Sequence, residues 1–173
     1  MDFEKELKTS RWSIRRNAAR HEECPASILN SLAMDPSGNV RNAVASNPNC
    51  PLSALKQLAS DKMKHVQHAA LTNKNCPVSI LESAAGNQQA TVRRIVAAHP
   101  NISMAVLNNL AYDPSINVRR MLAKNPKCPI LAMEHLISDA KYLIRKAVSE
   151  NPNCPEEIKM VFCCRTLDKT IHI

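Results

Sequence analysis

Hydrophobic residues recur along this chain at helical spacing, in a pattern that repeats every 26 residues. In one copy, Val40, Ala43 and Val44 follow the i, i+3, i+4 spacing that places side chains on one face of a helix. A second stripe of the same kind, from Ala54 to Ala59, follows after a short interval. Each copy of the pattern therefore predicts two short amphipathic helices.

The pattern occurs six times without an insertion. The β-branched residues that open the copies are Ile14, Val40, Val66, Val92, Val118 and Ile144. A constant period of about 20 to 50 residues is typical of solenoids, in which each unit stacks only on its neighbours. The sequence therefore predicts an all-α solenoid of about six 26-residue, two-helix repeats, with essentially no strand.

Proline marks the boundary between the two helices of a repeat. Pro48 follows Asn47, and a residue before proline is pushed out of the α region, so the first helix should end there. Cys50 precedes Pro51, and proline is favoured at the first helical position, so the second helix should start at Pro51.

The hydrophobic columns also indicate how the N-terminal residues fit the pattern. Phe3 and Leu7 stand one period before Leu29 and Ala33. Residues 1–10 are therefore expected to form a half-repeat that caps the first layer.

The last repeat differs from the others in one column. Lys159 stands where the other repeats carry Leu or Met, as a solvent-facing last layer requires. Residues 165–173 match no repeat position, and we expect them to be a C-terminal tail. We expect the cap and the repeats, which run from about residue 11 to 164, to form a single domain over residues 1–164.

The phrases Val-Arg-Arg, Asn-Pro-x-Cys-Pro, Leu-x-x-Leu-Ala and Asp-Pro-Ser resemble the variant leucine-rich repeat family, a HEAT-like group. The clearest copies are Val40–Asp61 and Val118–Asp139, and the resemblance covers roughly residues 12–163. It implies alternating short helices stacked into a right-handed superhelix. Because the repeat here is slightly longer than is usual in that family, we expect its first helix to be fuller α. The cysteine cluster that holds an iron–sulfur centre in that family has no counterpart, since the chain contains no Cys-x-x-Cys.

Composition sets limits on the setting and the partners. The net charge of +8 permits attraction to acidic partners or nucleic acid, although solubility explains it about as well. The first eight residues are too charged for a signal peptide, and no apolar run approaches the ~20 residues of a membrane span. We therefore expect a cytoplasmic protein that does not enter a membrane.

Five repeats place a cysteine before the second helix, namely Cys24, Cys50, Cys76, Cys128 and Cys154. Stacked helices lie about 8–10 Å apart, whereas a disulfide needs Cα atoms within about 7 Å and zinc–sulfur bonds are about 2.3 Å. We therefore predict a buried packing role, with no metal and no cofactor. Cys163 falls in a column of small core residues and is also expected to be buried, which leaves Cys164 as the candidate exposed thiol.

Two further polar columns are expected to be structural. The end of the first helix carries His21, Asn47, Asn73, His99, Asn125 and Asn151. A polar residue on an apolar stripe must be hydrogen-bonded, and these side chains should satisfy free backbone groups at the helix ends.

The first arginine column is Arg15, Arg41, Gln67, Arg93, Arg119 and Arg145. An aspartate follows twenty residues later in most repeats, but Gln67 is matched by Asn87, so both charges are lost together. We therefore expect each arginine to pair with the aspartate twenty residues on, in preference to the one six residues before it.

A second basic column lies two residues past each anchor, about 200° around the helix and away from the core. Lys124 lies one helical turn after Arg120. With the cations of this column it completes our candidate binding set: Arg16, Arg94, Arg120, Lys124 and Lys146. A solvated face without a ligand is the open alternative.

The third repeat should be the weakest layer. It loses the charge pair at Gln67 and Asn87, has Lys74 in place of the turn proline, and has the small Ala84 in a leucine column.

For function, we expect a non-enzymatic scaffold that binds another protein, of acidic character, through its repeat surface. The alternative is nucleic-acid binding, in which a basic stripe contacts the phosphate backbone. An enzyme lacks support, because the chain has no nucleophile–base motif, no glycine-rich loop and no metal-ligand spacing.

Overall fold

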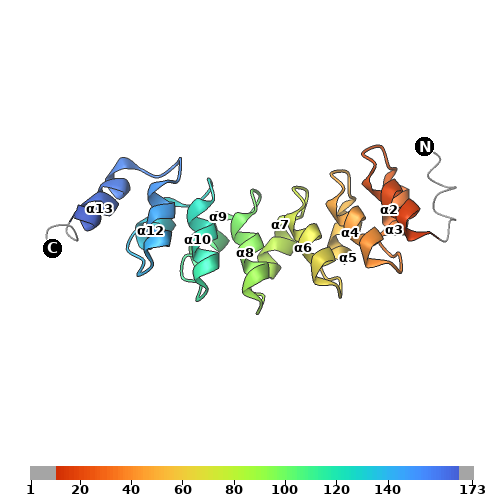
Figure 1. Ribbon diagram of the computed structural model, residues 1–173, viewed down its shortest axis with the longest axis horizontal. Helices are drawn as coiled ribbons and strands as arrows, with labels where there is room; N and C mark the ends of the chain where they lie inside the picture. Colours follow the sequence, from red (N-terminus) through yellow and green to blue (C-terminus); the bar gives the residue numbers. More distant parts are fainter. Residues whose placement is uncertain (1–10, 168–173) are drawn as a thin grey trace. The chain divides into compact units, whose positions relative to one another are not determined.

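The computed structural model describes residues 11–167, and the side chains of residues 11–164. In this part of the chain every regular element is a helix, and the helices alternate as first and second members of the repeats (Figure 1). The first helices are α2 (Trp12–Arg20), α4 (Gly38–Ser46), α6 (Lys64–Thr72), α8 (Ala90–Ala98), α10 (Ile116–Lys124) and α12 (Tyr142–Ser149). The second helices are α3 (Ala26–Leu32), α5 (Leu52–Leu58), α7 (Val78–Ala85), α9 (Met104–Leu110), α11 (Ile130–Leu136) and α13 (Glu156–Leu167). The predicted all-α repeat solenoid is thereby confirmed.

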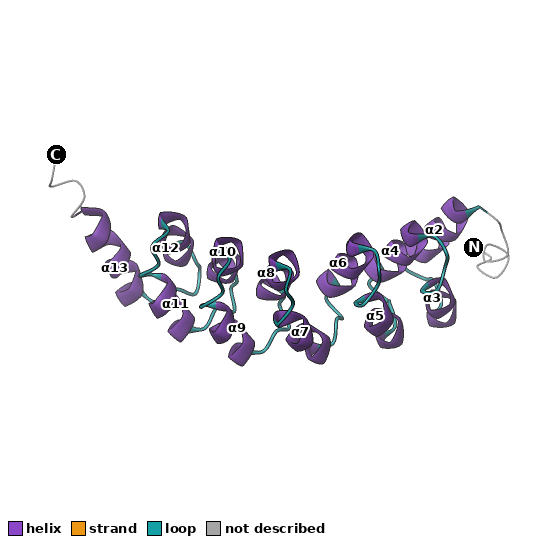
Figure 2. Ribbon diagram, turned by 90° about the horizontal axis from the view of Figure 1, so that it is seen from below, coloured by secondary structure: helices purple, strands orange, loops and turns teal. Residues whose placement is uncertain are grey.

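The described residues form two compact units, which divide between Leu81 and Glu82, within α7. In the first unit α4 packs between α2 and α6, while α3 and α5 form a second row. In the second unit α10 packs between α8 and α12, and α9 and α11 form the second row (Figure 2). The single domain over residues 1–164 and the right-handed superhelix stay predictions, and the cap at residues 1–10 lies outside the described residues.

The core of each unit lies between the two rows and is made by the predicted columns. Val40, Val66, Val92, Val118 and Ile144 are all fully buried, as are Leu55, Leu81 and Leu107. Burying side chains of this size contributes about 1.5–3 kcal/mol each, so the repeating apolar columns hold the layers together. The first helices are α-helical over eight or nine residues, which confirms the fuller helix that the longer repeat indicated.

The start of the second helices differs by one residue from the prediction. Pro51 is the N-cap of α5 and not its first residue, because its ψ of 148° is extended. Its carbonyl oxygen nevertheless accepts the first helical hydrogen bond, from the Leu55 N–H at 2.9 Å. Proline thus starts the helix from just outside it, where its missing N–H leaves nothing unpaired.

The C-terminal end also needs a correction. Helix α13 continues to Leu167, so the first three residues of the expected tail are helical, and residues 168–173 lie outside the described range. Cys163 is exposed and not buried. The equivalent residues Ala33, Ala59, Ala111 and Ile137 are buried.

Candidate functional site

Within each unit, the asparagines of this column join a repeat to the one before it. The Asn47 side-chain amide donates to the carbonyl oxygens of Ala19 at 2.7 Å and of His21 at 3.0 Å, while its oxygen accepts from the Asn49 N–H. The same pattern recurs in both units at Asn73, Asn125 and Asn151. These side chains are nearly fully buried, so the column is structural, as predicted. The sequence did not show that the carbonyl acceptors belong to the preceding repeat.

The two histidines of this column keep one part of the asparagine pattern. The Nδ1 of His21 accepts from the Glu23 N–H, and the Nδ1 of His99 accepts from the Asn101 N–H. They therefore stand in for the asparagine oxygen, as expected.

The first arginine column forms the predicted pairs. Arg15, Arg41, Arg93 and Arg119 each bond the aspartate twenty residues on, with Nε–Oδ2 distances of 2.5 to 2.7 Å. The pairs are largely buried, with 8% of the Arg41 side chain and 8% of the Asp61 side chain exposed.

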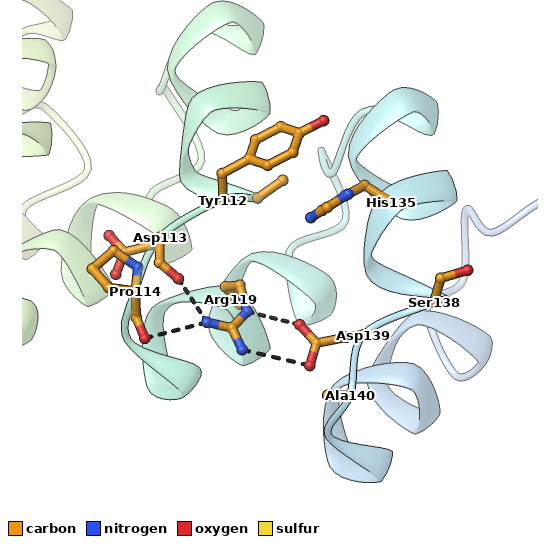
Figure 3. Close-up of a pocket in the computed structure, with 9 residues that line it drawn as sticks. Tyr112, Asp113, Pro114, Arg119, His135, Ser138, Asp139 and Ala140 are labelled. Carbon is orange, nitrogen blue, oxygen red and sulfur yellow. Dashed lines mark hydrogen bonds and ion pairs between the residues drawn. The ribbon is translucent and has the colours of Figure 1, made fainter.

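The six-residue relation exists as well, through the main chain. The Nη1 of Arg119 donates to the carbonyl oxygen of Asp113 at 2.6 Å while its other side holds Asp139 (Figure 3). Arg93 makes the same bond to the carbonyl of Asn87, although that residue has no carboxylate. Arg41, Arg93 and Arg119 thus each bind a side chain of their own repeat and a carbonyl at the end of the preceding one.

These contacts keep the carboxylates ionised. Hydrogen bonds from Arg41 lower the pKa of Asp61 below its ordinary value, against the effect of partial burial. Burial raises the pKa of Asp113 and of Asp139, but hydrogen bonds from an arginine and a backbone N–H outweigh it, and the pKa is lowered. Since their charge is neutralised by arginine, these groups are structural rather than proton donors.

The cysteine column is buried, as predicted, and burial raises the pKa of Cys50 to about 12 and of Cys76 to about 11. Among the described residues, no group of three or more His, Cys, Asp or Glu side chains is placed to hold a metal ion. No helix in that range is long and apolar enough to cross a membrane.

The second basic column forms a cluster in the second unit. Arg94 on α8, with Arg120 and Lys124 on α10, are exposed and line one pocket of about 180 Å³, which Asn117 and Met121 complete. Within the part of the chain that the structure describes, none of these three cations is in an ion pair. Arg94, Arg120 and Lys124 are called the basic cluster below.

Lys146 does not belong to the basic cluster. It is exposed, but it pairs with Glu150 at 3.5 Å and does not line the pocket. The i, i+4 spacing at the end of α12 brings Glu150 to it, so Lys146 has an acidic partner that column position did not predict. Glu150 stands in the column of Lys124, so the charge of that column reverses in the last repeat.

Arg16, in the first unit, is half-buried rather than turned freely to solvent. Its guanidinium carbon lies 5.3 Å from the ring centroid of Trp12, four residues earlier on α2. The aromatic ring thus covers this cation and makes a cation–π contact with it.

A second hollow, of about 450 Å³, lies beside the Arg119–Asp139 pair and is lined by Tyr112, His135 and Ser138 as well (Figure 3). The Tyr112 and His135 ring centroids are 4.1 Å apart. Because the guanidinium of Arg119 is bonded to carbonyl and carboxylate oxygens, the hollow offers a pair of rings and not an available cation. Sequence reasoning missed it, and the one signal was a tyrosine in a column without another aromatic residue.

No protein-family model matches this sequence, and no curated protein matches it. Among solved structures, one described as "a leucine-rich repeat variant with a novel repetitive protein structural motif" aligns with a TM-score of 0.66. The alignment has 23% sequence identity and covers 91% of this chain and 67% of that one. At this identity the likeness concerns the fold alone. The chain therefore has the repeat α-solenoid fold of the leucine-rich repeat variant.

Proposed function

We propose that the protein is a non-enzymatic, cytoplasmic interaction scaffold that binds another protein, of acidic character, through the surface formed by α8 and α10. The observation that carries this proposal is the contrast between the two basic columns. The first is bonded to aspartates and carbonyls, whereas the basic cluster is exposed and has no acidic partner among the described residues.

The shape of the site also supports a binding role. Arg94, Arg120 and Lys124 are exposed, so a partner reaches them without a rearrangement of the helices. Exposed cations contribute little to the stability of a fold, and complementary charge speeds association and selects partners.

Nucleic-acid binding is less well supported than protein binding. A nucleic-acid backbone presents phosphates at regular intervals and rewards a basic surface that continues from layer to layer. Here the ion pair of Lys146 with Glu150 interrupts the stripe in the last repeat.

The proposal is tested with a fluorescently labelled oligoglutamate peptide and the full chain. A triple variant, Arg94→Gln, Arg120→Gln and Lys124→Gln, is compared with a matched control in which Lys56, Lys127 and Lys141 become Gln. Both lose the same charge, so only a site-specific effect separates them. We expect the first variant to bind about tenfold more weakly or worse, and the control to bind nearly as the natural chain does.

Equal losses in the two variants would mean that net charge alone attracts the peptide, and would contradict the proposal. An oligonucleotide provides the second arm. Tighter binding to it, with an affinity that falls steeply with salt, would favour the nucleic-acid alternative.

A further inference from the structure

We infer that the pocket of the basic cluster is a binding site for a phosphoryl group carried by a protein partner, a phosphorylated serine or threonine side chain. This inference rests on the proposed function and adds the chemical group that the partner presents.

Positive charge is concentrated in this pocket. Arg94, Arg120 and Lys124 contribute three positive charges to one pocket, and no acidic side chain lines it. Arg120 and Lys124 are four residues apart on α10, a spacing at which like charges destabilise a helix slightly. Neither cation has an acidic side chain beside it in the pocket, so a ligand with two negative charges in one small group can bind both. A phosphate monoester has about −1.5 to −2 charges at neutral pH, whereas a carboxylate has one.

The hydrogen-bond donors of the pocket also suit a phosphoryl group. A phosphoryl group offers three strong acceptor oxygens. Two guanidinium forks and one ammonium supply charge-assisted donors of the kind that phosphate prefers, and the Asn117 amide provides a neutral donor in the same lining. Met121 adds an apolar wall, against which the carbon atoms of a phosphorylated side chain would pack.

The volume of the pocket limits the size of its ligand. Sites for whole cofactors and drug-sized ligands occupy about 300–1,000 Å³. The pocket is about 180 Å³, so it fits one charged group rather than a nucleotide or a cofactor.

The surroundings favour a protein as the carrier. The column of Lys124 carries Glu150 in the next repeat, and Lys146 is paired with that glutamate. The cations thus serve one phosphoryl group, while a nucleic-acid strand brings a series of phosphates that the neighbouring layer does not receive.

The test uses three labelled peptides that differ at one position: acetyl-Gly-Asp-X-Asp-Gly-amide with phosphoserine, serine or glutamate at X. Fluorescence anisotropy with the full chain gives the Kd of each. We expect the phosphoserine peptide to bind about tenfold more tightly than the glutamate peptide. The phosphoryl group has more negative charge than a carboxylate and a third acceptor oxygen, so it can bond to all three cations of the basic cluster. Arg120→Gln and Lys124→Gln should each remove most of that difference, and Lys127→Gln should leave it intact.

Arg120→Lys separates recognition by geometry from recognition by charge. This variant keeps the charge but loses the planar guanidinium fork. We expect it to weaken the binding of the phosphoserine peptide several-fold and to leave the binding of oligoglutamate unchanged. Far-UV circular dichroism of each variant verifies that the exposed substitutions leave the helices folded.

Equal Kd values for the phosphoserine and glutamate peptides would overturn this inference and leave the proposed scaffold function standing. If neither oligoglutamate nor the phosphoserine peptide binds to the chain, both the inference and the proposed scaffold function are overturned. A single-stranded oligonucleotide that binds more tightly than the phosphoserine peptide, and is lost in the same variants, would overturn the inference in favour of nucleic acid.

Discussion

Arg119 and Arg120 are adjacent in the sequence and have opposite environments in the fold. Arg119 donates to the Asp139 carboxylate and to the carbonyl oxygens of Asp113 and Pro114. Arg120 lies in the exposed lining of the basic pocket. A turn of about 100° around one helix therefore separates a structural cation from an available one.

This contrast gives a prediction for stability. Arg119→Ala should lower the free energy of unfolding by about 1–3 kcal/mol, because a largely buried carboxylate and two carbonyls lose their donor. Arg120→Ala should change it by less than about 0.5 kcal/mol, since the side chain is exposed. Urea unfolding followed by circular dichroism measures both. Similar losses in the two variants would contradict the assignment of Arg119 as structural.

The lowered pKa of Asp61 gives a prediction for pH. A carboxyl group with a lower pKa in the folded chain than in the unfolded chain stabilises the fold above the unfolded pKa, about 3.9. That contribution is lost as the pH falls through the folded pKa, because the carboxylate becomes protonated. Arg41 is the main cause of the lowered pKa. We expect stability to be nearly constant from neutral pH to about 5 and to fall below about 4. Arg41→Ala should flatten part of this fall, and an unchanged acid profile in that variant would count against the pair.

The cysteines give a prediction for reactivity. Cys163 and Cys164 are exposed, whereas the five column cysteines are buried. Burial raises the pKa of Cys128 to about 12, so almost no thiolate forms there at neutral pH. We expect an aromatic disulfide reagent to modify two thiols rapidly in the folded protein and the other five only in denaturant. Rapid modification of all seven would show that the column is accessible.

At the scale of the elements, asparagine side chains join consecutive first helices within each unit. The Asn125 amide donates to the Ala97 carbonyl oxygen at 2.7 Å, and its oxygen accepts from the Lys127 N–H at 2.8 Å. Both groups lie at helix ends, where the main chain has no helical partner left. One side chain therefore ends one helix, shapes the turn after it and fixes the neighbouring helix.

Asn125→Ala tests that role. We expect it to destabilise the chain by about 1–3 kcal/mol, because a buried carbonyl and an N–H are left unpaired. Asn109→Ala is the matched control, since Asn109 is exposed on α9, and it should be close to neutral. An effect of equal size at both positions would exclude a special role for the column.

Features that depend on the type of side chain at a repeat position could be predicted from the sequence. Hydrogen bonds to main-chain groups could not. The helices, the buried columns and the Arg–Asp pairs followed from period and from the joint loss at Gln67 and Asn87. The carbonyl acceptors did not, because every residue has a carbonyl and so none leaves a mark in the sequence.

The candidate site was predicted in part, for a similar reason. Column position identified Arg94, Arg120 and Lys124 as outward-facing, which the structure bears out. Lys146 is exposed as well, but Lys146 and Arg16 have partners four residues away, Glu150 and Trp12, which column position did not show. Such local contacts depend on residues unique to one repeat, which a comparison between repeats averages out.

At the scale of the molecule, the third repeat is the place to look for local opening. Of its second helix, α7, only Leu81 is buried, whereas α5 buries three residues. Its arginine column carries Gln67, so the bidentate pair that stabilises other repeats is missing.

We expect residues 62–87 to exchange amide hydrogens faster than the repeats on either side, because fewer buried contacts must be broken to open them. Hydrogen exchange followed by mass spectrometry measures this directly. Replacing Ala84 by Leu, the residue that most repeats carry there, should slow the exchange if small packing is the cause. Uniform protection over all the described repeats would refute the weak layer.

The asparagine and arginine side chains that bridge consecutive repeats end on main-chain carbonyl oxygens, which are present whatever amino acid the neighbour carries. A repeat therefore makes few demands on the sequence of the one before it. Recombination that duplicates or removes a segment of 26 codons keeps every donor opposite an acceptor, while the gain or loss of one codon misaligns both series. The number of repeats can therefore change in evolution with little damage to the fold. Surface residues such as Arg94 and Arg120 can diverge separately within each copy.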